Sequence, residues 1–194
     1  MNKSNSFLEG IILEIKDDLV NDFFLEEDIS EIISDKKPVK YIDEMVISYL
    51  KEIKLYIKVY IEYRIAMMED SYYTLSKVLL ELWKDWGIDD TSMFLVNGMI
   101  DKKHSLEKIK IFIVKNIFDI VYSFFQENLS NYLYLQFFKE TDIFFSIGDK
   151  DSMLWIDLCR KYDLTFSQLK KLSLYYTPEE AERVIKYGED IDDE

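Results

Sequence analysis

The stretch that decides the fold is residues 39–70, VKYIDEMVISYLKEIKLYIKVYIEYRIAMMED, which contains neither proline nor glycine. Apolar residues recur in it at steps of three and four, and this spacing places them on one side of an α-helix. The apolar stripe is wide, so the helix is expected to contact neighbours on two sides, as a central helix does. We therefore predict a helix over about 39–70, the longest in the chain, at the centre of the fold.

Shorter amphipathic patterns flank this stretch and predict further helices over about 8–20, 26–34, 71–86, 105–128, 152–159, 166–172 and 178–187. The last of these begins with Thr177-Pro178-Glu179-Glu180, a capping hydroxyl followed by proline and two acids, which is a typical helix start. Residues 91–100 fit either a short helix or a turn at Asn97-Gly98. Residues 109–114 and 131–138 alternate well enough to be strands, but their context favours helix, so both assignments stay open.

The composition favours an all-α fold. The chain has 194 residues, 48% of them hydrophobic, with five glycines and two prolines, too few for a turn-rich β fold. We predict one helical domain over 1–194, a bundle or orthogonal array of roughly seven to nine helices around the helix at 39–70. Residues 150–187 are a candidate C-terminal helical subdomain, and residues 189–194 form an acidic tail.

The charge pattern argues against nucleic acid as a partner. The net charge is −14, and residues 1–37 and 179–194 each contribute −6 of it. Phosphate binding needs clustered Lys and Arg, whereas acidic ends suit solvation or a basic protein partner. No apolar run is long enough for a signal peptide core or a membrane span. The expectation is therefore a cytoplasmic protein that does not enter membranes, and its oligomeric state stays open.

Residue types that support catalysis are scarce. Cys159 is the one cysteine and His104 the one histidine, which excludes an internal disulfide and every metal motif built on two histidines or several cysteines. Gly-rich phosphate-binding motifs are absent from the sequence. Acids at helical spacing, Glu14 with Asp17 and Asp18 and Glu27 with Glu31, suggest an acidic-site hydrolase only as a third hypothesis. We expect no enzyme activity, cofactor or metal.

The leading functional hypothesis is a non-enzymatic protein that inhibits or occludes a basic protein partner, of the immunity, antitoxin-like or phage anti-defence type from a bacterium or phage. It rests on the acidic ends and on 14 tyrosines, a residue type that suits interfaces, although core packing explains tyrosines as well. The candidate partner-binding residues are Tyr56, Tyr60, Tyr63, Tyr72, Tyr73, Glu189, Asp190, Asp192, Asp193 and Glu194.

The alternative is a transcriptional regulator. Residues 154–173, LWIDLCRKYDLTFSQLKKLS, fit two short helices joined by a tight turn, as in a helix-turn-helix. Its candidate DNA-binding residues are Arg160, Lys161, Gln168, Lys170 and Lys171. A plain helical hairpin explains the same pattern, because the turn has no glycine and the C-terminal acids lie immediately downstream. No family resemblance emerges from these residues.

Overall fold

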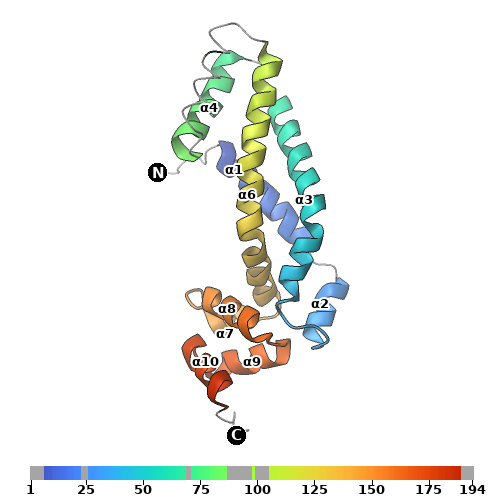
Figure 1. Ribbon diagram of the computed structural model, residues 1–194, viewed down its shortest axis with the longest axis vertical. Helices are drawn as coiled ribbons and strands as arrows, with labels where there is room; N and C mark the ends of the chain where they lie inside the picture. The colour runs from blue at the N-terminus through green and yellow to red at the C-terminus, as the bar shows by residue number, and fades with distance from the viewer. Residues whose placement is uncertain (1–6, 23–25, 69–70, 87–97, 99–104, 189–194) are drawn as a thin grey trace. The chain divides into compact units, whose positions relative to one another are not determined.

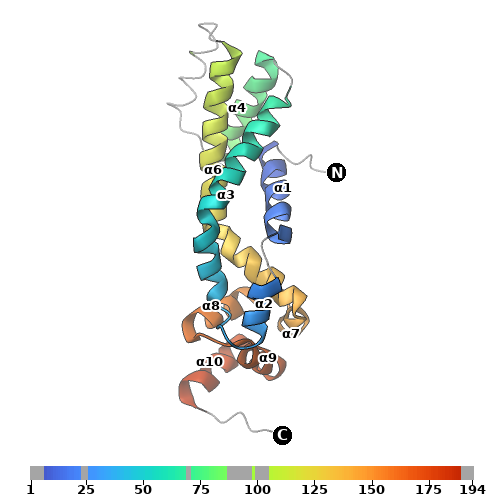
Figure 2. The same cartoon turned by 90° about the vertical axis from the view of Figure 1, so that its right-hand side faces the viewer.

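The computed structural model describes residues 7–22, 26–68, 71–86, 98 and 105–188. Within them every regular element is a helix, which confirms the all-α prediction (Figures 1 and 2). The helices are α1 (Phe7–Asp22), α2 (Glu26–Ile33), α3 (Tyr41–Ala66), α4 (Tyr72–Trp86), α6 (Leu106–Glu140), α7 (Ile143–Ile147), α8 (Ser152–Tyr162), α9 (Phe166–Tyr175) and α10 (Pro178–Tyr187). None of these helices is long and apolar enough to cross a membrane.

The prediction that the longest helix lies at 39–70 was wrong. Helix α3 has 26 residues, whereas α6 has 35 and is the longest described helix. Residues 109–114 and 131–138, for which a strand had stayed open, are both part of α6. Residues 131–138 are helical because Leu133, Tyr134, Phe137 and Phe138 recur at helical spacing and are all fully buried, and no proline or glycine interrupts the chain between 106 and 140.

The contacts divide the chain into two compact units. Unit 1 comprises residues 1–19 and 50–127, and so contains most of α1, the second part of α3, α4 and the first part of α6. Its core is mostly aliphatic, with Ile11, Ile57 and Ile113 among the fully buried side chains, and it includes the ring of Phe125. The Glu81 carboxylate of α4 accepts hydrogen bonds from the first backbone N–H groups of α1, at Phe7 (3.1 Å) and Leu8 (2.9 Å), and so satisfies donors that a helix start leaves unpaired.

Unit 2 comprises residues 20–49 and 128–194, with α2, the start of α3, the end of α6 and α7–α10. Its core includes Phe137, Trp155 and Leu169, each at most 1% exposed. Helix α9 packs against α7, α10 and α2. Residues 150–187, the candidate subdomain, lie within this unit together with the segments from 20–49 and 128–140.

Capping residues fix the N-terminal ends of the last two helices, α9 and α10. Thr165 and Gln168 form a reciprocal capping box at the start of α9, and Thr177 and Glu180 form the second at the start of α10. In each box the threonine side chain accepts an N–H from the third helical residue, whose own side chain accepts the N–H of the threonine. The helix start read from residues 177–180 in the sequence is confirmed by this geometry.

Candidate binding surfaces

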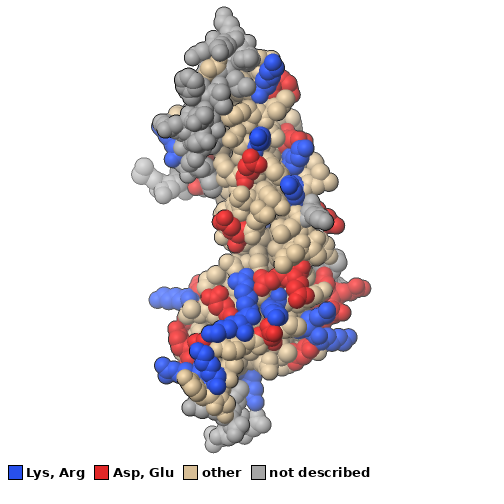
Figure 3. All heavy atoms as spheres, in the orientation of Figure 1, with Lys and Arg blue, Asp and Glu red and all other residues tan. Residues whose placement is uncertain are grey.

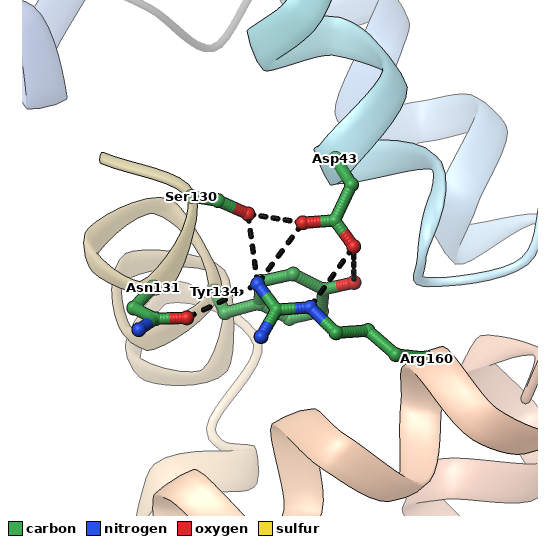
Figure 4. Close-up of polar contacts among 5 residues, drawn as sticks. All are labelled: Asp43, Ser130, Asn131, Tyr134 and Arg160. Atoms are coloured by element: carbon green, nitrogen blue, oxygen red, sulfur yellow. Dashed lines mark hydrogen bonds and ion pairs between the residues drawn. The ribbon is translucent and has the colours of Figure 1, made fainter. Parts of the chain in front are cut away.

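The most extensive polar network in the described residues is centred on Arg160 of α8 and lies inside unit 2 (Figure 4). Its guanidinium donates Nε–H to Oδ2 and Nη2–H to Oδ1 of Asp43 on α3, both at 3.0 Å. Nη2 also donates to Ser130 Oγ and Asn131 Oδ1 on α6, again at 3.0 Å. The Tyr134 hydroxyl donates to Asp43 Oδ2 (3.0 Å), and Ser130 Oγ donates to Asp43 Oδ1.

These contacts keep Asp43 and Arg160 charged and paired. Burial raises the pKa of the Asp43 carboxyl, but the hydrogen bonds from Arg160 and Ser130 outweigh it, so the pKa is lowered overall. Burial raises the pKa of the Tyr134 hydroxyl, and the nearby Asp43 carboxylate raises it further. The ring of Tyr134 also lies under the guanidinium, 4.9 Å from Arg160 Cζ. The network joins three helices and pairs Arg160 with Asp43, so it positions α8 against α3 and α6 within unit 2.

The candidate DNA-binding residues have structural partners. Arg160 belongs to the network, Lys161 pairs with Glu182 on α10 at 2.6 Å, and Gln168 closes the capping box of α9. Lys170 lies with its ammonium 5.9 Å from the Phe166 ring centre, and Lys171 is half-buried with an interaction of its own. Helices α8 and α9 therefore occupy the two predicted positions, and three of the five side chains, Arg160, Lys161 and Gln168, have polar partners within unit 2.

Two of the predicted interface tyrosines fasten α1 to α3 within unit 1. The Tyr56 hydroxyl donates to Asp18 Oδ2 at 2.5 Å, and the Tyr60 hydroxyl donates to Glu14 Oε2. Arg64 forms an ion pair with the same Glu14 carboxylate. Two of the acids that suggested a metal site in the sequence, Glu14 and Asp18, are thus partners of hydroxyl and guanidinium groups. The described residues contain no group of three or more His, Cys, Asp or Glu that could hold a metal ion.

Of the other candidate partner-binding residues, three are exposed tyrosines and the rest lie outside the residues that the structure describes. Tyr63, Tyr72 and Tyr73 are exposed, and the ring of Tyr73 is covered by the Lys77 ammonium at 4.4 Å. The acidic tail 189–194 and His104 lie outside the described residues. Cys159 is fully buried, and burial raises the pKa of its thiol, which makes it a poor nucleophile.

A small groove of about 150 Å³ lies between α8 and α10 in unit 2. Its apolar floor is formed by Leu154, Leu158 and Pro178, and its charged lining consists of Asp157, Lys161, Glu179 and Glu182. Glu182 accepts hydrogen bonds from Lys161 at 2.6 Å, Tyr162 at 3.1 Å and Lys186 at 3.1 Å, which lower the pKa of its carboxyl to about 2. Glu182 therefore stays ionised throughout the physiological pH range, paired with Lys161 and Lys186.

The charge of the chain is concentrated in the unit that contains this groove. Unit 2 holds 22 Asp and Glu against 11 Lys and Arg, a net charge of −11, whereas unit 1 holds 16 against 13, a net charge of −3. Charged side chains of both signs crowd the surface around α8, α9 and α10 in Figure 3. Sequence analysis located the negative charge at the two chain ends but could not assign it to one unit.

A larger groove, of about 660 Å³, lies between α3 and α6 in unit 1. Its apolar residues are Leu55, Ile111, Val114 and Phe118, and its charged residues are Lys54, Lys58, Glu62, Lys115 and Asp119. Sequence analysis missed this site. The available signal was the recurrence of Lys51, Lys54 and Lys58 at helical spacing beside an exposed leucine, which marks a second, basic face on an otherwise apolar helix.

Comparisons with protein families, with curated proteins and with solved structures found no match.

Proposed function

We propose that the protein is a non-enzymatic binding protein that occludes a basic surface of a protein partner, and that unit 2 makes the contact. The observation that carries the proposal is the groove between α8 and α10, where apolar side chains lie next to acids in the unit with a net charge of −11. A basic side chain with a long aliphatic stem matches both features, because its methylene groups pack on apolar residues while its charge faces carboxylates.

The residues around the groove fit a binding role. Asp157 and Glu179 are exposed at its rim, and Leu154 is 43% exposed on its floor. The Arg160 network and the capping box of α10 hold the two helices that carry these residues. A groove on rigid helices loses little conformational freedom on binding, which favours affinity. Under this proposal the protein acts as an inhibitor of the immunity, antitoxin-like or phage anti-defence type.

The test compares charge-neutral variants of the two units. Partners are captured from an extract of the source organism on wild-type protein, identified by mass spectrometry and purified, and their binding kinetics are then measured. The variant Asp157→Asn/Glu179→Gln removes two acids at the groove, and Glu52→Gln/Glu127→Gln removes two exposed acids of unit 1 as the matched control. Glu182 is left unchanged because its carboxylate already accepts hydrogen bonds from Lys161 and Tyr162.

We expect a basic partner whose affinity falls about tenfold with the groove variant and less than about twofold with the control. Removal of residues 189–194 takes away five acids, and because exposed charges steer association, this truncation should lower the association rate and its salt dependence with little effect on dissociation. A partner that is acidic, or one that the control variant weakens as much as the groove variant, would refute the proposal.

A further inference from the structure

The groove of unit 1 lies between two helices, α3 and α6. Its α3 residues 54, 55, 58 and 62 and its α6 residues 111, 114, 115, 118 and 119 recur at helical spacing. Each set spans nine residues, about 12 Å at 1.5 Å per residue, which matches roughly two turns of a third helix. From this geometry and the charges described next, we propose that the groove binds an amphipathic helix of a partner protein that carries acidic residues beside its apolar face.

The apolar part of the groove is unusually open. Leu55, in the middle of α3, is 64% exposed, and Ile111, in the second turn of α6, is 62% exposed. A helix that docks between α3 and α6 would cover both side chains, and a helix presents apolar anchors at positions i, i+3, i+4 and i+7 to a groove of this kind. These exposed apolar residues therefore favour a partner helix that presents an apolar face to the groove.

The α1 helix does not use this part of α3. It is held by Tyr56, Tyr60 and Arg64, whereas the groove uses Lys54, Lys58 and Glu62, each two positions earlier in the chain. Two positions correspond to about 200° around a helix, so the two sets lie on nearly opposite sides of α3. Unit 1 has thus filled one side of the helix with α1 and left the other side open.

The lysines of the groove indicate that the docked helix carries negative charge. Lys58 lies 3.9 Å from Glu62 and so pairs with this acid within the groove. Asp119 is the second acid of the lining, and three lysines against two acids leave the groove a net charge of +1. Lys54 is 5.2 Å from the centre of the Tyr122 ring, and this contact leaves its charge uncompensated by a carboxylate. Lys115 forms no hydrogen bond or ion pair with any residue that the structure describes. Carboxylates flanking the apolar face of a docked helix would pair with Lys54 and Lys115.

This inference goes beyond the proposed function, because it concerns the other unit and a partner of opposite charge. The experiment uses the full chain and two fluorescent peptides of about 16 residues, long enough to begin to form a helix in isolation. Both peptides carry leucine and phenylalanine at i, i+3, i+4 and i+7. One has glutamate on either side of this face, and the other has lysine at the same positions. Fluorescence anisotropy measures their binding at two salt concentrations.

The variant Ile111→Glu tests the groove, and Ile47→Glu is its control. Ile47 is 69% exposed and lies on the part of α3 that belongs to unit 2. Both changes place a glutamate at an exposed isoleucine in a helix, so circular dichroism should show both variants folded. The charge variant Lys54→Gln/Lys115→Gln keeps the apolar face and removes two cations. The groove variant Asp157→Asn/Glu179→Gln of unit 2 shows whether the two binding activities are independent.

We expect the glutamate peptide to bind, with an affinity that falls about tenfold in Ile111→Glu and stays within about twofold in Ile47→Glu and Asp157→Asn/Glu179→Gln. The charge variant should lose the preference for glutamate over lysine peptide and most of the salt dependence. Equal binding of both peptides, or indifference to Ile111→Glu, overturns the proposal. Two other results would also overturn it. One is a dimer of the chain that dissociates when Ile111 is changed to glutamate, and the other is a fluorescent fatty acid that binds in the groove and prevents peptide binding.

Discussion

Replacing Arg160 with methionine removes the centre of the network in unit 2 while it keeps a side chain of similar length. The change deletes two hydrogen bonds to Asp43, one to Ser130 and one to Asn131. It also leaves the Asp43 carboxylate without its counter-charge, although Ser130 and Tyr134 continue to donate to it. The prediction is a marked loss of stability with the helical fold retained.

The magnitude follows from the number of lost bonds and the exposure of the pair. Removing one partner of a fully buried ion pair costs about 3–5 kcal/mol. The side chains of Arg160 and Asp43 are 32% and 31% exposed, so water solvates part of the abandoned carboxylate. We therefore expect a loss of about 2–3 kcal/mol in the free energy of unfolding, or a fall in Tm of about 5–10 °C for a chain of this length.

Urea denaturation followed by circular dichroism measures the effect, with Lys161→Met as the matched control. Lys161 is the next residue on the same helix and pairs with Glu182 at the surface, where its side chain is 56% exposed. An exposed pair of this kind contributes little to stability, because water screens the two charges. In a double-mutant cycle, Arg160→Met and Asp43→Asn should show a coupling energy of about 1–2 kcal/mol. If Arg160→Met costs no more than Lys161→Met, the network does not hold unit 2 together.

Three further predictions concern single groups. Because the pKa of Asp43 is lowered in the folded state, the coupling energy between Asp43 and Arg160 should be constant at neutral pH and should decline only below the ordinary Asp pKa of 3.8, as the carboxyl protonates through its lower folded-state pKa. Urea titrations of the cycle at several pH values measure this, and a coupling energy that already falls above about pH 5 contradicts it. Cys159 is buried and its thiol pKa is raised, so a thiol reagent at pH 8 should react with the native protein at least about a hundredfold more slowly than with the unfolded chain. The change Thr177→Ala removes the cap of α10 and should cost about 1 kcal/mol by urea denaturation, whereas Thr177→Ser should cost little.

Local patterns in the sequence predict the helices well because each pattern has a local cause. The start of α10 at Pro178 follows from the capping box around Thr177, which lies entirely within four consecutive residues. The length of α6 was harder to predict, because aromatic residues in 131–138 satisfy strand alternation and helical spacing alike. Tertiary packing decides between them: Tyr134 and Phe138 are both buried, and the ring of Phe137 packs edge to face on Phe166 of α9 at 6.0 Å.

The sites were less predictable because they depend on contacts between distant segments. Arg160 and Asp43 are 117 positions apart, and nothing near Arg160 in the sequence distinguishes it from a surface arginine that reads DNA. Similarly, Tyr60 lies on a stripe that suits an interface, and only the position of Glu14 on α1 assigns it to an internal contact. The groove between α3 and α6 requires two helices whose lining residues lie at least 49 positions apart, as Glu62 and Ile111 do.

The most direct test of the proposed function is hydrogen exchange of the protein alone and in complex with its purified partner. The amides of α8 and α10 around Leu154, Asp157 and Glu179 should exchange more slowly in the complex, because the partner covers the groove between these helices. The amides of unit 1 should be unchanged unless the partner also carries an acidic helix. Protection confined to unit 1, with α8 and α10 unaffected, would contradict the proposal that unit 2 occludes the partner.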